Sequence, residues 1–276
     1  MPVQTYVEEK PPAPLAELVS TVWIQHVPAD SEPYLQRNIP NGSSEILCRL
    51  GQAPRVIGQR TMPSIDVLPP GTTVVGARVR PGATRTVFGV PGYELVDRSV
   101  DVAELESPGL DVLGEQLAGA RSPDETADVL KRRLLAQCAV APAIDPVVSE
   151  TVRRLEGVGH GGLRAIRSEL SLSERHFRRR VRQAVGLTPK VLERMLRFQR
   201  LLASTQSVLA RGEDPTDAGV AALAAAAGYA DESHLNRECR RLTGLSIGQY
   251  LAETCRDCGC GHDHGASFSR ILGLSS

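Results

Sequence analysis

The segment 223–242 reads LAAAAGYADESHLNRECRRL and constrains the fold more than any other stretch of the chain. A run of small residues is followed by a Gly-Tyr turn and then by a segment with polar and basic residues on one side. This order predicts two helices joined by a tight turn, the layout in which the second helix lies in the DNA major groove. A related pattern, IRSELSLSERHFRRRVRQAVG, occurs at 166–186. Two such units in one region indicate a sequence-specific DNA-binding protein.

The first unit has an inner face and a basic outer face. Phe177 and Val181 lie four residues apart, which places them on the inner side of one helix. Outward side chains early on a recognition helix reach base edges, and flanking ones reach phosphates. We therefore predict base contacts from Arg175, His176, Arg178 and Arg179, and a phosphate contact from Arg182.

The second unit repeats this order. Leu235 and Cys239 are predicted to face inward. Asn suits adenine and Arg suits guanine, because each can form two hydrogen bonds to its base edge. The predicted base-reading residues are Ser233, His234, Asn236 and Arg237, and those predicted to lie near phosphate are Arg240 and Arg241.

Such basic runs are also found on helix faces that only meet solvent. The occurrence of two units with the same internal order, joined by one amphipathic helix at 190–205, favours DNA binding over that alternative.

The charge distribution agrees with this interpretation only when it is taken by region. Lys+Arg and Asp+Glu are both 32, so the net charge is zero. Residues 161–256 hold 16 basic and 10 acidic residues, whereas residues 1–160 hold 15 and 20. A basic C-terminal block suits contact with phosphates, and the acidic N-terminal block would not bind DNA by itself.

The region 147–252 resembles the DNA-binding domain of AraC/XylS-type transcriptional regulators. The residues that carry the resemblance are IRSELSLSERHFRRRVRQAVGLTPKVLERMLRFQRLL and LAAAAGYADESHLNRECRRLTGLSIGQYL. It implies two helix-turn-helix subdomains bridged by a long helix, each placing one helix in successive major grooves. PNGSSEILCRLG, GARVRPGA and the single Trp23 are similar to an N-terminal domain found in such regulators, which implies a barrel with effector or dimerisation duties.

Four positions depart from the family pattern. Arg167 stands where a small residue is usual, and Ser171 stands at the turn glycine of the first unit. In the second unit, Ile247 replaces a frequent proline, and Cys239 replaces an inward aromatic residue.

The expected fold class is α+β, with an N-terminal small β-barrel-like domain and helix pair followed by an all-α double helix-turn-helix domain. Residues 1–14 look like a polar lead-in, and β-like runs occupy 19–27, 44–50, 55–59, 73–79 and 85–90. A barrel of this kind either holds a ligand or is filled by its own side chains. The expected boundaries are a β-rich domain at 1–140 with its helix pair at 101–137, a linker at 141–146, the DNA-binding domain at 147–254 and a tail at 255–276.

The tail contains a dense set of metal-binding residue types. Within CRDCGCGHDH, the candidate ligands are Cys255, Cys258, Cys260, His262 and His264, with Cys239 as a further candidate. A Cys-x-x-Cys pair places two thiolates on one ion, and the histidines can complete a tetrahedral site. Zn(II), Cu(I) or another thiophilic metal is the expected cofactor. The alternatives are a disordered tail that binds metal adventitiously and a thiol pair that responds to oxidants.

The chain has no apolar run of about 18 residues, so we expect no membrane span. Its N-terminus lacks the features of a signal peptide, and we expect a cytoplasmic protein. The expected partners are double-stranded DNA, RNA polymerase, a small-molecule or metal effector and a second copy of the chain.

We expect no enzymatic activity, because neither a Gly-rich phosphate loop nor a Ser/His/Asp nucleophile motif stands out. A DNA-repair methyl-acceptor protein is the main alternative, but the chain lacks a Pro-Cys-His-Arg motif. A metal-buffering protein is a second alternative, and one chelating tail on 276 residues would be inefficient storage.

Overall fold

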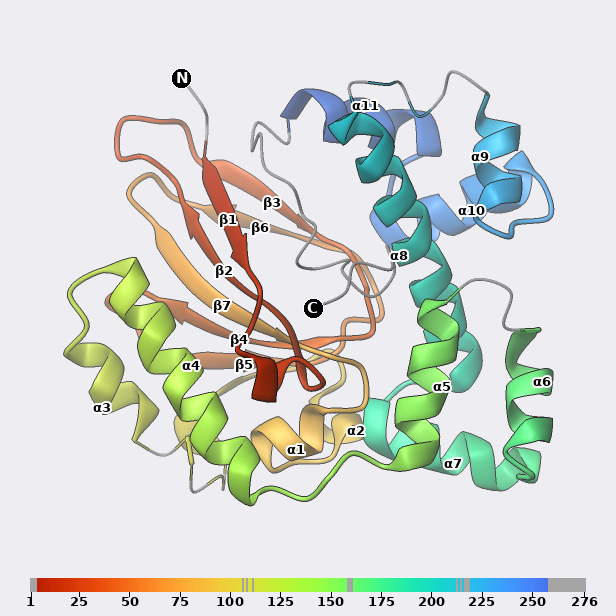
Figure 1. Cartoon of the computed structure of the whole chain (residues 1–276). Helices are drawn as coiled ribbons and strands as arrows, with labels where there is room; N and C mark the ends of the chain where they lie inside the picture. The colour runs from red at the N-terminus through yellow and green to blue at the C-terminus, as the bar shows by residue number, and fades with distance from the viewer. Residues whose placement is uncertain are drawn as a thin grey trace.

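The computed structural model describes residues 4–257 except 106, 108, 111, 158–160, 212, 214 and 216–218, and it leaves the side chains of 210 and 254–257 undescribed. The N-terminal part is rich in sheet, and the C-terminal part is helical (Figure 1). The predicted α+β class is therefore confirmed.

Two antiparallel sheets form the N-terminal part. The larger sheet has the order β1-β2-β7-β4-β5-β8, and β3 pairs with β6 in a separate two-stranded sheet. The sheets do not close into one barrel, so the barrel-like description holds only loosely. The strands are β1 (Thr5–Glu9), β2 (Val19–His26), β3 (Tyr34–Asn38), β4 (Ser44–Arg49), β5 (Arg55–Ile57), β6 (Ser64–Leu68), β7 (Thr73–Val79) and β8 (Ser99–Asp101).

The strand predictions for 19–27, 44–50, 55–59 and 73–79 are confirmed by β2, β4, β5 and β7. The prediction for 85–90 is wrong, because Thr84–Phe88 forms the helix α1. Its buried Thr84, Val87 and Phe88 follow helical spacing, and Gly89 ends the helix in the left-handed conformation at φ 77°. A short run of β-branched residues does not distinguish a strand from one buried helical turn.

The prediction of a polar lead-in over 1–14 is also wrong, because β1 lies in this segment. It pairs antiparallel with β2, with Glu8 opposite Trp23. The Tyr6 ring stacks on Trp23 at a centroid distance of 5.7 Å. Polar residues are compatible with a strand at the edge of a sheet, where one side of the backbone has no strand partner.

The two faces of the larger sheet differ in polarity. One face carries Val22, Ile46 and Val75, which belong to one buried core with Leu130 and Leu134 of the helix α4 (Pro123–Val140). Figure 1 shows α4 lying across the sheet.

The opposite face is polar. Arg78 lies between Glu8 at 3.7 Å and Glu45 at 2.7 Å. The Trp23 ring lies so close to Gly76 that a Cβ there would come within 2.4 Å of Cζ2. Tyr6, Trp23 and Arg78 thus occupy this face themselves.

Two further helices and a connection belong to the N-terminal part. The helix α3 (Leu113–Ala118) pairs with α4, so the predicted helix pair is present, but it begins later than the predicted residue 101, because Val102–Glu104 forms a single 3-10 turn after β8. The short helix α2 (Gly92–Leu95) lies between α1 and β8. The connection between α4 and the next helix covers 141–145.

Seven helices of the described residues form the C-terminal part. Figure 1 shows α8 running between two groups, with α5, α6 and α7 near its first half and α9, α10 and α11 near its second half. The bounds are α5 (Pro146–Glu156), α6 (Gly162–Glu169), α7 (Glu174–Val185), α8 (Pro189–Ala210), α9 (Val220–Ala226), α10 (Glu232–Thr243) and α11 (Ile247–Asp257).

One buried core serves both groups of helices. It contains Phe177 of α7, Leu235 of α10 and the α8 residues Leu192, Met195 and Phe198. Because close-packed interiors resist deformation, this shared core holds α7 and α10 in one fixed relation.

The turn between α6 and α7 contains a strained residue. Ser171 has φ 52°, and its amide bonds to the Ser168 carbonyl while the Leu172 amide bonds to that of Arg167. This hydrogen-bond pair is the Schellman motif, which favours glycine at the left-handed position. The matching turn after α9 has Gly228 at φ 76°. The departure at Ser171 therefore places a side chain in an unfavourable backbone conformation.

We predict that Ser171→Gly stabilises the protein. Relief of the left-handed conformation is worth about 1–2 kcal/mol, and the added freedom of glycine in the unfolded chain offsets about 0.4–1 kcal/mol. The net gain in the free energy of unfolding should be roughly 0.5–1 kcal/mol, measured by chemical denaturation. The control Gly228→Ser should lower the same quantity, and a loss of stability in Ser171→Gly would contradict the interpretation.

Candidate nucleic-acid interface

The helix α7 presents a buried face and a free basic face. Ser173 begins the helix by accepting a hydrogen bond from the His176 amide at 3.3 Å, and Gly186 ends it with φ 84°. Phe177, Val181 and Val185 are buried. The exposed side chains include all those predicted to contact DNA, namely Arg175, His176, Arg178, Arg179 and Arg182. None of these five side chains is hydrogen-bonded or ion-paired to another described residue.

One arginine of the same helix has a structural role that the sequence did not predict. Arg180 donates from Nε and Nη2 to the two carboxylate oxygens of Asp145, at 2.7 and 2.6 Å. Asp145 also caps α5 by accepting from the Val147 amide. Partial burial alone would raise the pKa of Asp145, but the hydrogen bonds from Arg180 and the α5 backbone lower it. This pair fixes α7 against α5.

The helix α10 repeats α7 position by position. The two helices start at Glu174 and Glu232 and end at Val185 and Thr243, so equivalent residues lie 58 apart. Asp231 begins α10 by accepting from the His234 amide at 2.6 Å, and Gly244 ends it with φ 82°. The inward-facing predictions are confirmed, because Leu235 and Cys239 are both fully buried.

The predicted contact residues of α10 fall into two groups. Ser233, Arg237, Arg240 and Arg241 are exposed. The other two predicted residues are half-buried. His234 accepts from the Ala230 amide and meets the Tyr229 ring edge-on at 5.3 Å. Asn236 accepts from the Ile247 amide through Oδ1 at 3.1 Å. Base contacts by these residues stay predictions.

The helix α8 is tied to both units by polar contacts as well as by its apolar side. Arg194 pairs with Glu238 of α10 at 2.6 Å, with both side chains mostly buried. Arg197 lies over the Tyr229 ring at 5.7 Å, and Arg200 donates to the Leu155 carbonyl of α5. The sequence held no local signal for the Arg194 and Arg180 pairs, because their partners lie 44 and 35 residues away.

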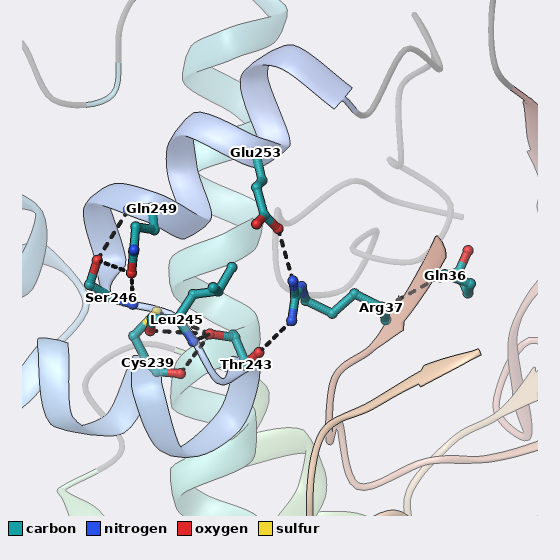
Figure 2. Close-up of polar contacts among 8 residues, drawn as sticks. All are labelled: Gln36, Arg37, Cys239, Thr243, Leu245, Ser246, Gln249 and Glu253. Carbon is teal, nitrogen blue, oxygen red and sulfur yellow. Dashed lines mark hydrogen bonds and ion pairs between the residues drawn. The ribbon is translucent and has the colours of Figure 1, made fainter. Parts of the chain in front are cut away.

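The N-terminal part contacts the C-terminal ends of both α7 and α10. Arg37 of β3 donates to the Thr243 carbonyl at 2.9 Å and pairs with Glu253 of α11 at 3.2 Å (Figure 2). Thr243 is the last residue of α10, whose carbonyl is one of the acceptors left free at a helix end. Arg37 thus satisfies that acceptor from another domain.

At the C-terminal end of α7, the backbone of α2 lies very close to the backbone of α7. A Cβ at Gly92 of α2 would lie 2.3 Å from the Ala184 carbonyl oxygen, and one at Gly186 would lie 2.4 Å from Val96. Two glycines therefore allow α2 to pack directly on the end of α7. A third link joins Arg80 to Glu156 of α5 at 3.8 Å, with both side chains buried.

The metal-site prediction lies almost entirely outside the described residues. Cys258, Cys260, His262 and His264 are beyond Asp257, and Cys255 belongs to α11 with its side chain undescribed. Among the residues that the structure describes, no group of three or more His, Cys, Asp or Glu side chains could hold a metal. The tail site stays a prediction.

Cys239 is described, and its sulfur lies in the core. Its Sγ is 3.6 Å from the Thr243 hydroxyl, and burial raises the pKa of the thiol. A metal could reach Cys239 only if the packing of α10 opened.

Comparison with protein families assigns both parts of the chain. Residues 167–253 match a family described as a helix-turn-helix domain, and residues 7–101 match a domain of unknown function, DUF6597. No curated protein matches the chain. None of the described helices is long and apolar enough to cross a bilayer.

The solved structures similar to this one include several of ToxT from Vibrio cholerae. That from strain O395 has 12% identity and a TM-score of 0.40, covering 90% of this chain and 96% of that chain. A P21 crystal form has 11% identity and a TM-score of 0.42, covering 90% and 98%. ToxT of strain SCE256 bound to unsaturated fatty acid has 13% identity and a TM-score of 0.38, covering 90% and 94%.

We predict that Asp145→Asn destabilises the protein in a pH-dependent way. The lowered pKa of Asp145 means that its charge contributes stability above the unfolded value of about 4, and that this contribution is lost as the pH falls through the folded pKa. The side chain is 28% exposed, so we expect a loss of about 1 kcal/mol at pH 7.

The loss should shrink as the pH is lowered from 7 towards 3, when measured by chemical denaturation at each pH. Asn keeps an acceptor for the Val147 amide, so the loss comes from the charge and from the second oxygen that accepts from Arg180. An equal loss at both pH values would contradict this account.

Proposed function

The chain carries an AraC-type helix-turn-helix domain behind a DUF6597 domain, and on this basis we propose that it regulates transcription by binding specific DNA sequences through α7 and α10. The observation that carries the proposal is the match between these helices at a constant offset of 58 residues. Each has a buried apolar face, a capped start and a row of arginines that are free of partners within the described part of the chain.

The geometry suggests which residues contact which part of DNA. Arg175 and Arg179 lie on the outward stripe of α7, at positions equivalent to Ser233 and Arg237 of α10. The guanidinium group of an arginine at such a position can donate two hydrogen bonds, to N7 and O6 of guanine. We propose base reading by these four residues and, on α7, also by His176 and Arg178. The residues proposed to bind phosphates, in the last turns of the two helices, are Arg182, Arg240 and Arg241.

The net positive charge of residues 161–256 favours binding to DNA and attracts the protein to DNA before contact. Residues 161–256 carry 16 basic and 10 acidic residues. Each phosphate neutralised by a basic side chain releases counterions and makes affinity depend on salt. Because one core holds both recognition helices, little ordering of the domain is required on binding.

We place the response to an effector in the N-terminal domain. Its contacts with the ends of α7 and α10, through α2 and Arg37, offer a physical route by which a change in that domain alters DNA affinity. A small-molecule effector, a second copy of the chain and RNA polymerase are the partners that this role calls for.

A second input is proposed for the Cys/His cluster. Cys255, Cys258, Cys260, His262 and His264 would bind Zn(II), Cu(I) or a related thiophilic ion, or the thiols would respond to oxidants. The cluster begins in α11, two residues after Glu253, which pairs with Arg37. A metal bound there would act next to the contact between α11 and the N-terminal domain.

The DNA proposal predicts different effects for a base-reading and a phosphate-binding arginine. Sites selected from random DNA by the purified protein should share a sequence. Arg179→Ala should weaken binding to that site by about 1–3 kcal/mol and relax the preference at one base pair. Arg182→Ala should weaken binding about equally for all sequences and lower the salt slope by about one.

Fluorescence anisotropy at several salt concentrations measures both effects. Gln183→Ala is a matched control, because Gln183 is an exposed neutral residue of the same helix. Failure of the unmodified protein to enrich any sequence would overturn the proposed function.

The metal proposal predicts a change in DNA affinity on titration of Zn(II) or Cu(I) into the reduced protein. The variant Cys255→Ser/Cys258→Ser/Cys260→Ser should lose that change and keep the metal-free affinity. Identical DNA affinity with and without metal in both proteins would rule out metal sensing.

A further inference from the structure

The start of α11 differs from the equivalent start of α8. With the offset of 58 residues, Ile247 corresponds to Pro189, and both are the first residues of their helices. Proline has no backbone N–H, so α8 begins without a donor at this position. Ile247 has one, and it is directed to Oδ1 of Asn236 at 3.1 Å. Ile247 is 3% exposed, so its amide depends on a protein acceptor.

The residue equivalent to Asn236 in the first unit is Arg178. Arg178 is exposed and makes no hydrogen bond or ion pair with the described remainder of the chain. Asn236 is half-buried and bonded to α11. The side chain at this helical position is thus available for DNA contact in α7, whereas in α10 it is hydrogen-bonded within the protein.

Resting on the proposed function, we infer that Asn236 is a positioning residue that caps α11 and that only Arg178 of this equivalent pair reads a base. Recognition of adenine by asparagine requires the carbonyl oxygen and the amide nitrogen to face the base edge together. In Asn236 the carbonyl oxygen already accepts a hydrogen bond from the Ile247 amide, so it is engaged within the protein. The second unit then reads bases through Ser233 and Arg237. The first unit therefore contacts more bases than the second.

Other contacts hold the start of α11 in the same place. Ser246 accepts from the Gln249 amide at 3.3 Å, and the Gln249 side chain accepts from the Ser246 amide at 3.0 Å (Figure 2). These bonds serve different donors from the Ile247 amide, so none can replace Asn236. Turning Asn236 towards DNA would leave a buried donor without a partner, which is unfavourable.

The test compares Arg178→Ala with Asn236→Ala by selection from random DNA and by binding to a panel of single base-pair changes. Arg178→Ala should relax the preference at one base pair and weaken binding to the best site by roughly tenfold. Asn236→Ala should keep the preference at every base pair within about twofold, while its melting temperature falls. In hydrogen exchange, the Ile247 amide should exchange faster in Asn236→Ala than in the unmodified protein.

Asn236→Asp covers the case in which Asn236→Ala fails to fold. Aspartate keeps an acceptor for the Ile247 amide and lacks the amide donor that adenine recognition needs. This variant should keep the slow exchange of the Ile247 amide and the base preferences, although its charge weakens binding to all sequences alike. Loss of a base-pair preference in either Asn236 variant would overturn the inference. Absence of any enriched sequence with the unmodified protein would instead overturn the proposed function, and the inference with it.

Discussion

The apolar side of α8 is the constraint on which the two DNA-binding units depend. Its Leu192, Met195 and Phe198 belong to the same buried core as Phe177 of α7 and Leu235 of α10. Each unit buries its apolar side chains in the core that it shares with this helix. The 22 residues of α8 give a length of about 33 Å, comparable with one turn of DNA. Packing on one helix therefore sets the relation between both recognition helices.

Local signals predicted the helical part well, because helix ends are determined by nearby residues. Ser173, Thr188 and Asp231 cap helices through their own side chains, and Gly186 ends one with a positive φ. The β-rich part depends on distant partners, which a sequence pattern does not reveal. The residues of β1 do not predict a strand by themselves, because the strand forms through pairing with β2. The residues of α1 favour a strand by composition, and their run is too short to show the helical period.

The candidate DNA-contacting residues show the same difference between what local sequence signals predict and what depends on distant partners. Helical periodicity separated inward Phe177 and Leu235 from the outward arginines, and the structure places both sets as expected. Periodicity does not show which polar side chains are already engaged. Asn236 is engaged because Ile247 supplies a backbone donor where proline would supply none. That pairing needs α11 to fold back on α10, so only the three-dimensional structure reveals it.

The two domains meet at the C-terminal ends of α7 and α10. The position of this contact determines how the two helices can move. The C-terminal end of α10 is held by Arg37, and that of α7 packs on α2 at Gly186. The N-terminal halves of both helices, which carry Arg175, Ser233 and their neighbours, stay free of these contacts. A state that separates the domains must break the Arg37 contacts and expose the packed end of α7. A ligand that favoured one such state would therefore shift α7 and α10 together, since both helices pack in one shared core.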